Sequence, residues 1–305
     1  MAGFKSRMIN FLIRNRHWFR GKLQKERFDG NTSIAAFRDR CEKGANRFGR
    51  LPEGVIVKND RIAGMTGEWL IPSGADPAKV ILYVHGGGYV SGSCNDHRGV
   101  VSKLALKTGV TCLVYEYRLA PEHPFPAAVV DSVSAYRHLL AAGFNPARIL
   151  LAGESAGGGL ALALLLALKN ERLPMPVAAV SISPWADLTC SGSSYRTKNK
   201  VSAAPLDSWF VFRKHYAGDH PLNDPLLSPV FGDLEGLPPL FINAGTDDEL
   251  FDDATRFVMR AQHAGVDVTF RQGEGMLHCY PLMAGMFPEA TEALDEIVAF
   301  IRSKL

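Results

Sequence analysis

The sequence predicts an α/β domain built on a mostly parallel, eight-stranded sheet with helices on both of its faces. Three observations lead to this class. Short, nearly continuous apolar runs recur along the 305 residues, longer segments with helical spacing separate them, and no repeat or linker divides the chain. Continuous apolar runs are expected where helices cover both faces of a sheet. Regular alternation of strand and helix builds such a sheet from parallel strands.

Eight strands are expected along the chain. The first two, at 55–57 and 68–71, lie on either side of a Gly-containing turn and should form an antiparallel pair. The six later strands are expected at 80–84, 111–115, 149–152, 177–182, 239–243 and 266–270. Helices are expected between and after them, at 97–107, 127–142, 156–169, 253–264 and 289–303.

Two regions do not fit this alternation, residues 1–48 and residues 190–222. Both are rich in aromatic and basic residues and show no strand pattern. We expect them to form one helical cap, while residues 49–189 and 223–305 form the catalytic core. The N-terminus lacks the uninterrupted apolar segment and the small-residue cleavage site of a signal peptide. A basic amphipathic helix lying on a membrane is the alternative there, and the cap is favoured.

Composition and charge argue against several classes of protein. A net charge of +3 is too mild to indicate nucleic-acid binding. No apolar run reaches the roughly 20 residues of a membrane-spanning helix, so an integral membrane protein is not expected. The five cysteines are odd in number and lack CxxC spacing, which predicts neither a metal site nor a disulfide framework. Free thiols suit a reducing cytoplasm, the expected location. Exposed edge strands and helices allow a homodimer, but no residue identifies one.

The strongest local motif is the G-x-S-x-G of residues 153–157, which follows a predicted strand and opens a predicted helix. A nucleophilic serine needs a sharp strand-to-helix turn that leaves its hydroxyl open at the carboxyl edge of the sheet. Glycine on both sides removes the side chains that would clash in that turn. Ser155 is therefore the candidate nucleophile, and the N–H of Ala156 is a candidate donor to developing negative charge. A plain glycine-rich turn is the alternative.

A second motif, HGGGY at residues 85–89, follows the strand expected at 80–84. Three consecutive glycines are costly to order unless the backbone itself has a role, and an oxyanion hole supplies one. Gly87 and Gly88 are the candidate donors, and His85 is expected to anchor the loop. A phosphate-binding loop is the competing interpretation, but neither G-x-G-x-x-G nor a P-loop Lys-Ser/Thr follows.

A nucleophilic serine requires a base and an acid that orients the base. In a hydrolase of this kind the order along the chain is Ser, then Asp or Glu, then His. Only His278 lies beyond the last predicted strand, so it is the candidate base. The acid should follow the strand at 239–243, where several carboxylates are crowded together. Physical reasoning from the sequence does not choose between Asp247 and Asp248.

Together these motifs resemble the bacterial branch of the hormone-sensitive lipase family of esterases. HGGGY at 85–89 matches the HGGG motif of that family, and GESAGG at 153–158 is similar to its GDSAGG, with Glu154 in place of Asp. The most specific likeness is YRLAPEHPFPA at 117–127, and SPWADL at 183–188 is similar to the SPW-D-L stretch of the family. The resemblance covers roughly residues 50–305 and implies the α/β-hydrolase fold with a helical cap over the acyl pocket.

The resemblance also bears on the acid. In the family pattern D-x-L-x-D the first Asp is catalytic, and residues 248–252 fit this pattern without a gap, which implies Asp248. The family histidine is usually followed by Gly, whereas Cys279 follows His278 here, a departure at that loop. The oxyanion donors implied are the N–H groups of Gly87, Gly88 and Ala156.

The sequence therefore predicts a serine carboxylesterase that works through an acyl-enzyme and needs neither metal nor cofactor. Its partner is a small-molecule ester, and the residues expected to contact it are Tyr89, Trp209 and Phe210. Because aromatic groups in the cap would shorten a pocket, short to medium acyl chains are expected. A non-catalytic receptor on the same fold is an alternative, as is acyl transfer or amide hydrolysis by the same triad.

Overall fold

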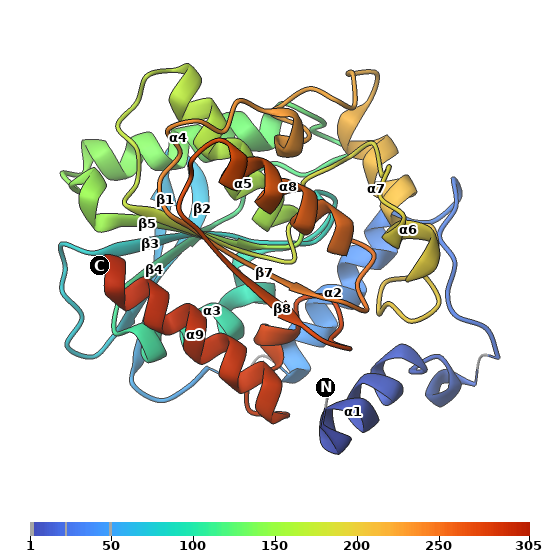
Figure 1. Ribbon diagram of the computed structural model, residues 1–305. Coiled ribbons are helices and arrows are strands. Elements are labelled where there is room, and N and C mark those ends of the chain that lie inside the picture. Colours follow the sequence, from blue (N-terminus) through green and yellow to red (C-terminus); the bar gives the residue numbers. More distant parts are fainter. Residues whose placement is uncertain (1–2, 22, 49–50) are drawn as a thin grey trace.

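A single eight-stranded sheet forms the centre of the computed structural model, which describes residues 3–21, 23–48 and 51–305 (Figure 1). The strand order across the sheet is β1-β2-β4-β3-β5-β6-β7-β8. β2 pairs antiparallel with β1 and β4, and the other neighbours pair parallel, as predicted. The strands are Val55–Ile62 (β1), Met65–Pro72 (β2), Val80–Val84 (β3), Thr111–Tyr115 (β4), Ile149–Glu154 (β5), Ala178–Ile182 (β6), Leu240–Gly245 (β7) and Val268–Gly273 (β8).

Helices cover both faces of this sheet (Figure 1). α3 and α9 pack on one face, and α4, α5 and α8 pack on the other. Because both faces are covered, strands β3 to β7 are buried along their whole length, which explains their continuous apolar sequences. These helices are Cys94–Thr108 (α3), Ala127–Ala141 (α4), Ala156–Asn170 (α5), Phe251–His263 (α8) and Pro288–Lys304 (α9).

The elements differ from their predicted positions mainly at their ends. The last strand begins at Val268, two positions later than the apolar run indicates. Val266 belongs instead to the end of α8, where its N–H donates to the carbonyl of Ala261. Gly265, at φ +78°, donates to Gln262, and the two bonds together form a Schellman motif. Val266 is buried as the apolar residue that closes this helix end, so its hydrophobicity does not indicate a strand.

Four helices lie outside the strand–helix alternation (Figure 1). They are Phe4–Arg14 (α1), Ile34–Phe48 (α2), Ser194–Thr197 (α6) and Ser208–Ala217 (α7). Four short 3₁₀ turns complete the described elements: Trp18–Arg20, Pro146–Arg148, Pro229–Phe231 and Tyr280–Met283. The predicted cap-to-core boundary at 48/49 adjoins residues 49–50, which lie outside the described residues. Within the described parts of the chain, no helix combines the length and the apolar character needed to cross a membrane.

The two regions outside the alternation contact each other directly. Arg27 and Leu206 form an isolated parallel bridge, in which Phe28 N–H donates to Leu206 O over 2.9 Å. Next to it the ring centroids of Phe28 and Phe212 are 5.7 Å apart in an edge-on contact. The N-terminal region and the 190–222 insertion are therefore joined by one backbone bridge and by one aromatic contact.

Candidate active site

Ser155 lies in the sharp turn between β5 and α5, with the positive φ of +56° that a strand-to-helix elbow requires. The flanking glycines are required by close backbone contacts. A Cβ on Gly153 would lie 2.5 Å from the carbonyl oxygen of Gly157, and a Cβ on Gly157 would lie 2.2 Å from that of Val84. The turn is held by the N–H of Ser155, which donates to Ile182 O over 2.8 Å. The local sequence is thus the one that this geometry permits.

Ser155, His278 and Asp248 form a continuous hydrogen-bonded row. His278 Nε2 lies 2.9 Å from Ser155 Oγ, and His278 Nδ1 lies 2.7 Å from Asp248 Oδ2. Asp248 is completely buried, and its Oδ1 accepts the N–H of Leu250 over 3.1 Å. The three side chains come from the ends of three different strands, β5, β7 and β8, which meet at one edge of the sheet. The structure therefore brings together the three residues that the sequence singles out.

The neighbouring carboxylates Asp247 and Asp248 point in different directions. Asp247 lies 3.5 Å from Arg14 of α1 and 3.5 Å from Lys198, which follows α6. Its side chain is 22% exposed, whereas that of Asp248 is fully buried against His278. Of these two carboxylates, therefore, Asp248 contacts the histidine, and Asp247 ties the sheet edge to both regions outside the alternation.

The electrostatics of His278 are set by two opposing effects. Burial alone lowers the pKa of His278, but the buried carboxylate of Asp248 raises it. The net pKa of His278 lies well above its ordinary value of 6.5. An imidazole backed by such a carboxylate is a stronger acceptor for the hydroxyl proton of Ser155.

Cys279 occupies the position after the histidine where the hormone-sensitive lipase family usually has glycine. It nevertheless has the left-handed backbone conformation that glycine favours. Its φ is +54°, and its N–H donates to Ser183 Oγ over 3.1 Å. The departure in sequence therefore leaves a left-handed turn after His278, at a local conformational cost. Burial raises the pKa of the Cys279 thiol above 9.0, so at neutral pH it is not the thiolate that a nucleophile requires.

The glycines of the loop at residues 85–89 line the same cavity as Ser155. Gly87 and Gly88 have φ values of +116° and +66°, and a Cβ on Gly87 would lie 2.2 Å from Ser91 O. Within the part of the chain that the structure describes, no acceptor receives the N–H groups of Gly87, Gly88 or Ala156. The side chain of His85 is buried, stacks on Tyr117 and bonds to Gly86 O through Nδ1, as expected for an anchor.

A buried ion pair behind this loop is absent from the sequence-based prediction. His97 Nε2 lies 2.8 Å from Glu154 Oε1, and the same oxygen accepts the N–H of Gly86 over 2.5 Å. Burial lowers the pKa of His97, but Glu154 raises it to about 9, and the Nδ1 of His97 faces Ser93 O at 3.2 Å. When both ring nitrogens of His97 are protonated, Nε2 donates to Glu154 Oε1 and Nδ1 donates to Ser93 O. Glu154, next to Ser155 in sequence, thus fixes the start of the glycine loop.

The cavity over Ser155 has a volume of about 250 Å³ and a largely apolar wall. Of the predicted substrate contacts, Trp209 lines it, and its ring centroid lies 5.4 Å from that of His278. The described residues that line the cavity are Phe37, Gly86, Gly87, Gly88, Glu154, Ser155, Ala204, Pro205, Ser208, Trp209, Phe212, His278 and Cys279. The aromatic wall therefore combines α2 with α7.

Tyr89 and Phe210 do not line this cavity, contrary to expectation. Tyr89 has a φ of +62°, which turns its ring into the core, where it stacks on Tyr216 at a centroid distance of 3.7 Å. Phe210 lies on the outer side of α7, 39% exposed, with the guanidinium of Arg213 over its ring. Phe212, three positions after Trp209 and so on the same helix face, takes the place expected for Phe210.

The parallel sheet and the serine at its strand-to-helix turn define the chain as an α/β hydrolase. A family model described as "alpha/beta hydrolase fold" matches residues 81–282. An acetyl-hydrolase of Streptomyces hygroscopicus is 42% identical over 87% of each chain, and an esterase of Acinetobacter venetianus is 38% identical over 82% of each.

Solved structures narrow the class further. An esterase from the bacterial hormone-sensitive lipase family has a TM-score of 0.90, is 35% identical, and is matched over 100% of this chain and 99% of its own. EstE5, in a crystal soaked with p-nitrophenyl butyrate, has a TM-score of 0.90 and is 36% identical over 99% of each chain. The protein described here belongs to the bacterial hormone-sensitive lipase family of α/β hydrolases. The predicted fold, family and class of enzyme, a carboxylic ester hydrolase, are confirmed.

Proposed function

We propose that the protein hydrolyses small esters of short- to medium-chain carboxylic acids through an acyl-enzyme formed on Ser155. The observation that carries the proposal is the row Ser155–His278–Asp248, with separations of 2.9 and 2.7 Å, beside a cavity lined by unpaired backbone donors. A hydroxyl hydrogen-bonded to an imidazole, itself held by a buried carboxylate, is the arrangement that activates a serine.

In the first half-reaction the Ser155 oxygen attacks the ester carbonyl while His278 takes the hydroxyl proton. His278 then gives that proton to the departing alcohol, and the acyl group stays on Ser155 as an ester. In the second half-reaction water attacks the carbonyl of the acyl-enzyme while His278 takes one of its protons. The bond to the Ser155 oxygen then breaks, the carboxylic acid is released, and His278 returns the proton to Ser155. Asp248 keeps Nδ1 of His278 protonated and stabilises the imidazolium that forms in each half.

The negative charge on the carbonyl oxygen would be received by the N–H groups of Gly87, Gly88 and Ala156. Their glycine-rich backbone approaches the reacting carbon without a Cβ in the way, and Ala156 adds the N-terminal end of α5. The anchored loop needs no rearrangement when the charge appears, because Glu154 already holds it through Gly86 N–H.

The expected preference for short to medium acyl chains is supported by the small apolar cavity, which Phe37, Trp209 and Phe212 line. The name of the Streptomyces relative, an acetyl-hydrolase, points to the short end of the range. The p-nitrophenyl butyrate used with EstE5 belongs to the same range.

The test is hydrolysis of a series of 4-nitrophenyl esters, from acetate to palmitate, by the wild type and by Ser155→Ala. We expect the wild type to favour the short esters, and the variant to lose about 10⁴-fold or more in kcat while remaining folded. Trapping of the acyl group on Ser155, detected by mass spectrometry of the intact chain, would separate covalent from non-covalent catalysis.

Other outcomes would favour other functions. A folded wild type without activity on any ester would favour the receptor interpretation. Formation of methyl esters in the presence of methanol, at the expense of free acid, would favour acyl transfer. A clear preference for long-chain esters would contradict the proposed substrate range.

A further inference from the structure

Helix α1 buries two polar side chains and exposes four large apolar ones, while its Ile9 packs against the buried cluster around Tyr280. Ser6 and Asn10 are buried against the body, where Ser6 Oγ donates to Glu289 and Asn10 Nδ2 donates to Gly275 O over 2.9 Å. On the outer side, in positions spaced for one helix face, lie Phe4, Met8, Phe11 and Leu12, with exposed fractions between 41% and 85%. An amphipathic helix that serves the core of its own chain would be oriented the other way.

The apolar surface continues beyond the helix. The ring of Trp18, 53% exposed, contacts that of Phe11 at a centroid distance of 5.7 Å, and Phe19 is 73% exposed. We call the set Phe4, Met8, Phe11, Leu12, Trp18 and Phe19 the N-terminal apolar surface. Single exposed apolar residues are ordinary on proteins, but a continuous group of this kind marks an interaction surface.

The same segment carries only positive charge. Residues 1–25 contain seven Lys and Arg and no Asp or Glu. Lys5 and Arg7 are exposed, and the guanidinium of Arg7 makes no hydrogen bond or ion pair with any described residue. Three acidic groups face α1: Asp247 is paired with Arg14 and Lys198, Glu289 accepts from Gly3 and Ser6, and Glu274 lies across the hollow beside the helix.

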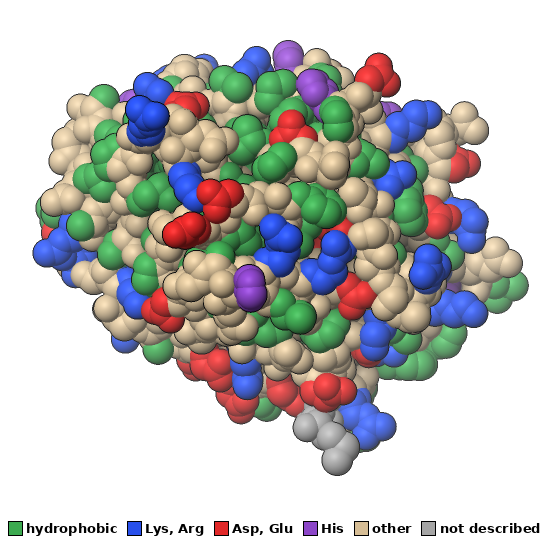
Figure 2. Space-filling view, turned by 45° about the horizontal axis from the view of Figure 1, so that its top comes forward, with side chains coloured by type: hydrophobic (Ala, Val, Ile, Leu, Met, Phe, Trp, Pro, Cys, Tyr) green, Lys and Arg blue, Asp and Glu red, His purple; other side chains and the backbone are tan. Residues whose placement is uncertain are grey.

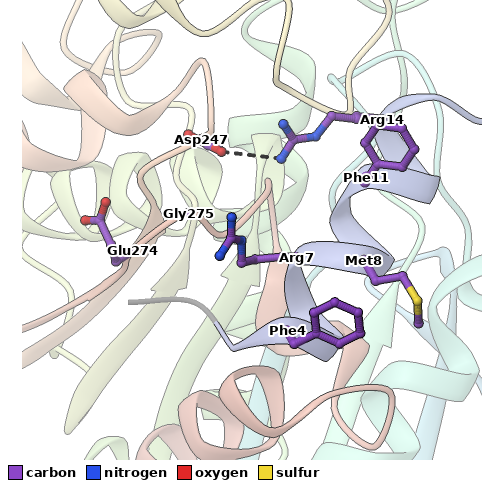
Figure 3. Close-up of a pocket in the computed structure, with 8 residues that line it drawn as sticks. All are labelled: Phe4, Arg7, Met8, Phe11, Arg14, Asp247, Glu274 and Gly275. Atoms are coloured by element: carbon purple, nitrogen blue, oxygen red, sulfur yellow. Dashed lines mark hydrogen bonds and ion pairs between the residues drawn. The ribbon is translucent and has the colours of Figure 1, made fainter.

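A hollow of about 900 Å³ opens between α1 and the loop after β8, and Arg7 extends into it (Figure 3). Phe4, Met8 and Phe11 lie along the helix side of this hollow, and Glu274 lies across it. The hollow therefore places the Arg7 cation beside the apolar side chains of α1 at the molecular surface, on the side of the helix that faces Glu274. A phospholipid headgroup and its acyl chains would meet such a combination of positive and apolar groups.

We propose that residues 3–19 form a docking surface by which the protein binds peripherally to an anionic lipid surface. Apolar side chains enter the boundary between headgroups and acyl chains, and the Lys and Arg residues meet the negative headgroups. A second copy of the chain fits this surface poorly, because self-association would bring two exclusively positive segments together.

The position of the surface gives docking a consequence for the proposed reaction. Asn10 contacts Gly275, and Arg14 contacts Asp247, so α1 rests on the two loops that carry His278 and Asp248. Arg16 donates to Ala203 O, next to the Ala204–Pro205 pair that lines the cavity over Ser155. Docking would therefore bring the cavity close to esters dissolved in the lipid. Binding itself needs no catalytic step, so it can fail or succeed independently of the proposed function.

The experiment is sedimentation of the full chain, as the Ser155→Ala protein, with vesicles of phosphatidylcholine alone or of phosphatidylcholine mixed with phosphatidylglycerol. We expect binding to the mixed vesicles, weakened by added salt, and little binding to phosphatidylcholine alone. Lys5→Glu/Arg7→Glu should weaken binding about fivefold or more for each charge removed. Phe4→Ser/Phe11→Ser should weaken it about tenfold or more, because both rings lose their burial in lipid.

The matched control is Ile56→Ser/Met259→Ser, which removes two side chains of similar exposure, 67% and 69%, from β1 and α8. It should bind as tightly as the parent. Equal loss in this control, equal binding to both kinds of vesicle, or no binding at all would each overturn the proposal. So would light scattering that finds a dimer which Phe4→Ser/Phe11→Ser converts to a monomer, since a second copy would then cover the surface.

Discussion

The loops around Ser155 and the helix α1 both bury polar side chains, but α1 also turns large apolar side chains outward. At the catalytic edge Asp248, Glu154 and His85 are almost completely buried, and each has a partner within hydrogen-bond distance. In α1 only Ser6 and Asn10 are fully buried, while aromatic side chains face outward. Figure 2 shows that charged and apolar side chains are mixed over one whole face of the molecule, so exposure of single apolar groups is not unusual in itself.

This contrast shows in which part of the molecule contacts inside the chain determine the type of residue. Around Ser155 a change of one carbon atom meets backbone within 2.2 to 2.5 Å, so residue type is dictated by contacts inside the chain. On the outer side of α1, Phe4 is 85% exposed, and the ring of Phe11 contacts that of Trp18, which is itself 53% exposed. Apolar residues that folding does not require point to a contact outside the chain, which is why the two regions call for different experiments.

The largest expected effect separates the two adjacent aspartates. Asp248→Asn should lower kcat by about 10⁴-fold, because an amide can hold His278 in the wrong tautomer and cannot stabilise its cation. Asp247→Asn removes only half-exposed ion pairs to Arg14 and Lys198 and should change kcat less than about threefold. Steady-state kinetics on 4-nitrophenyl acetate measure both. Similar losses in the two variants would contradict the assignment of Asp248.

The next effect concerns the glycine loop. Gly87→Ala should lower kcat by about 100- to 1000-fold, because the added Cβ lies 2.2 Å from Ser91 O and must displace an oxyanion donor. Gly64→Ala is the matched control, since Gly64 also has a positive φ, +89°, but has no atom near the added carbon. The control should lose stability by about 1 kcal/mol and keep its kcat. Full activity in Gly87→Ala would exclude this loop as the oxyanion hole.

The buried pair of His97 and Glu154 should appear as pH-dependent stability. The pKa of His97 is raised from 6.5 to about 9, so its contribution is fully present below pH 6.5 and is lost as pH rises through about 9. The free energy of unfolding of the wild type should therefore fall relative to that of His97→Gln over this window, by up to roughly 3 kcal/mol. Urea unfolding at both ends of the window measures it. A constant difference between the two proteins would show that His97 is not charged.

A smaller effect concerns the acid limb of the rate profile. Because the pKa of His278 lies above 6.5, kcat/KM of the wild type should fall with a midpoint above pH 6.5 as His278 becomes protonated. Asp248→Asn removes the carboxylate that raises this pKa, so the residual activity of the variant should have its acid limb at lower pH. An unchanged midpoint in the variant would mean that another group titrates.

The sequence predicts most of the fold and part of the site, for reasons visible in single residues. Ser155 and His278 could be paired in advance because a motif and a strand order bring them to one sheet edge. Asp247 and Asp248 could not be separated by local physics, since both follow β7 and only their directions differ. Tyr89 is expected from the sequence to contact the substrate, but its positive φ turns the ring inward. The pairing of Glu154 with His97 spans two elements and leaves no local pattern.

The smallest expected effects come from α1 itself and reverse the usual rule for apolar residues. Asn10→Ala should lower the free energy of unfolding by about 1 to 2 kcal/mol, because it leaves the buried carbonyl of Gly275 without its donor. Phe11→Ser, on the exposed side of the same helix, should change it by less than about 0.5 kcal/mol. Thermal unfolding of the two variants compares them directly. If Phe11→Ser proved the more destabilising, its ring would serve the fold of this chain, and the argument that the outer side of α1 is kept for a lipid surface would lose its basis.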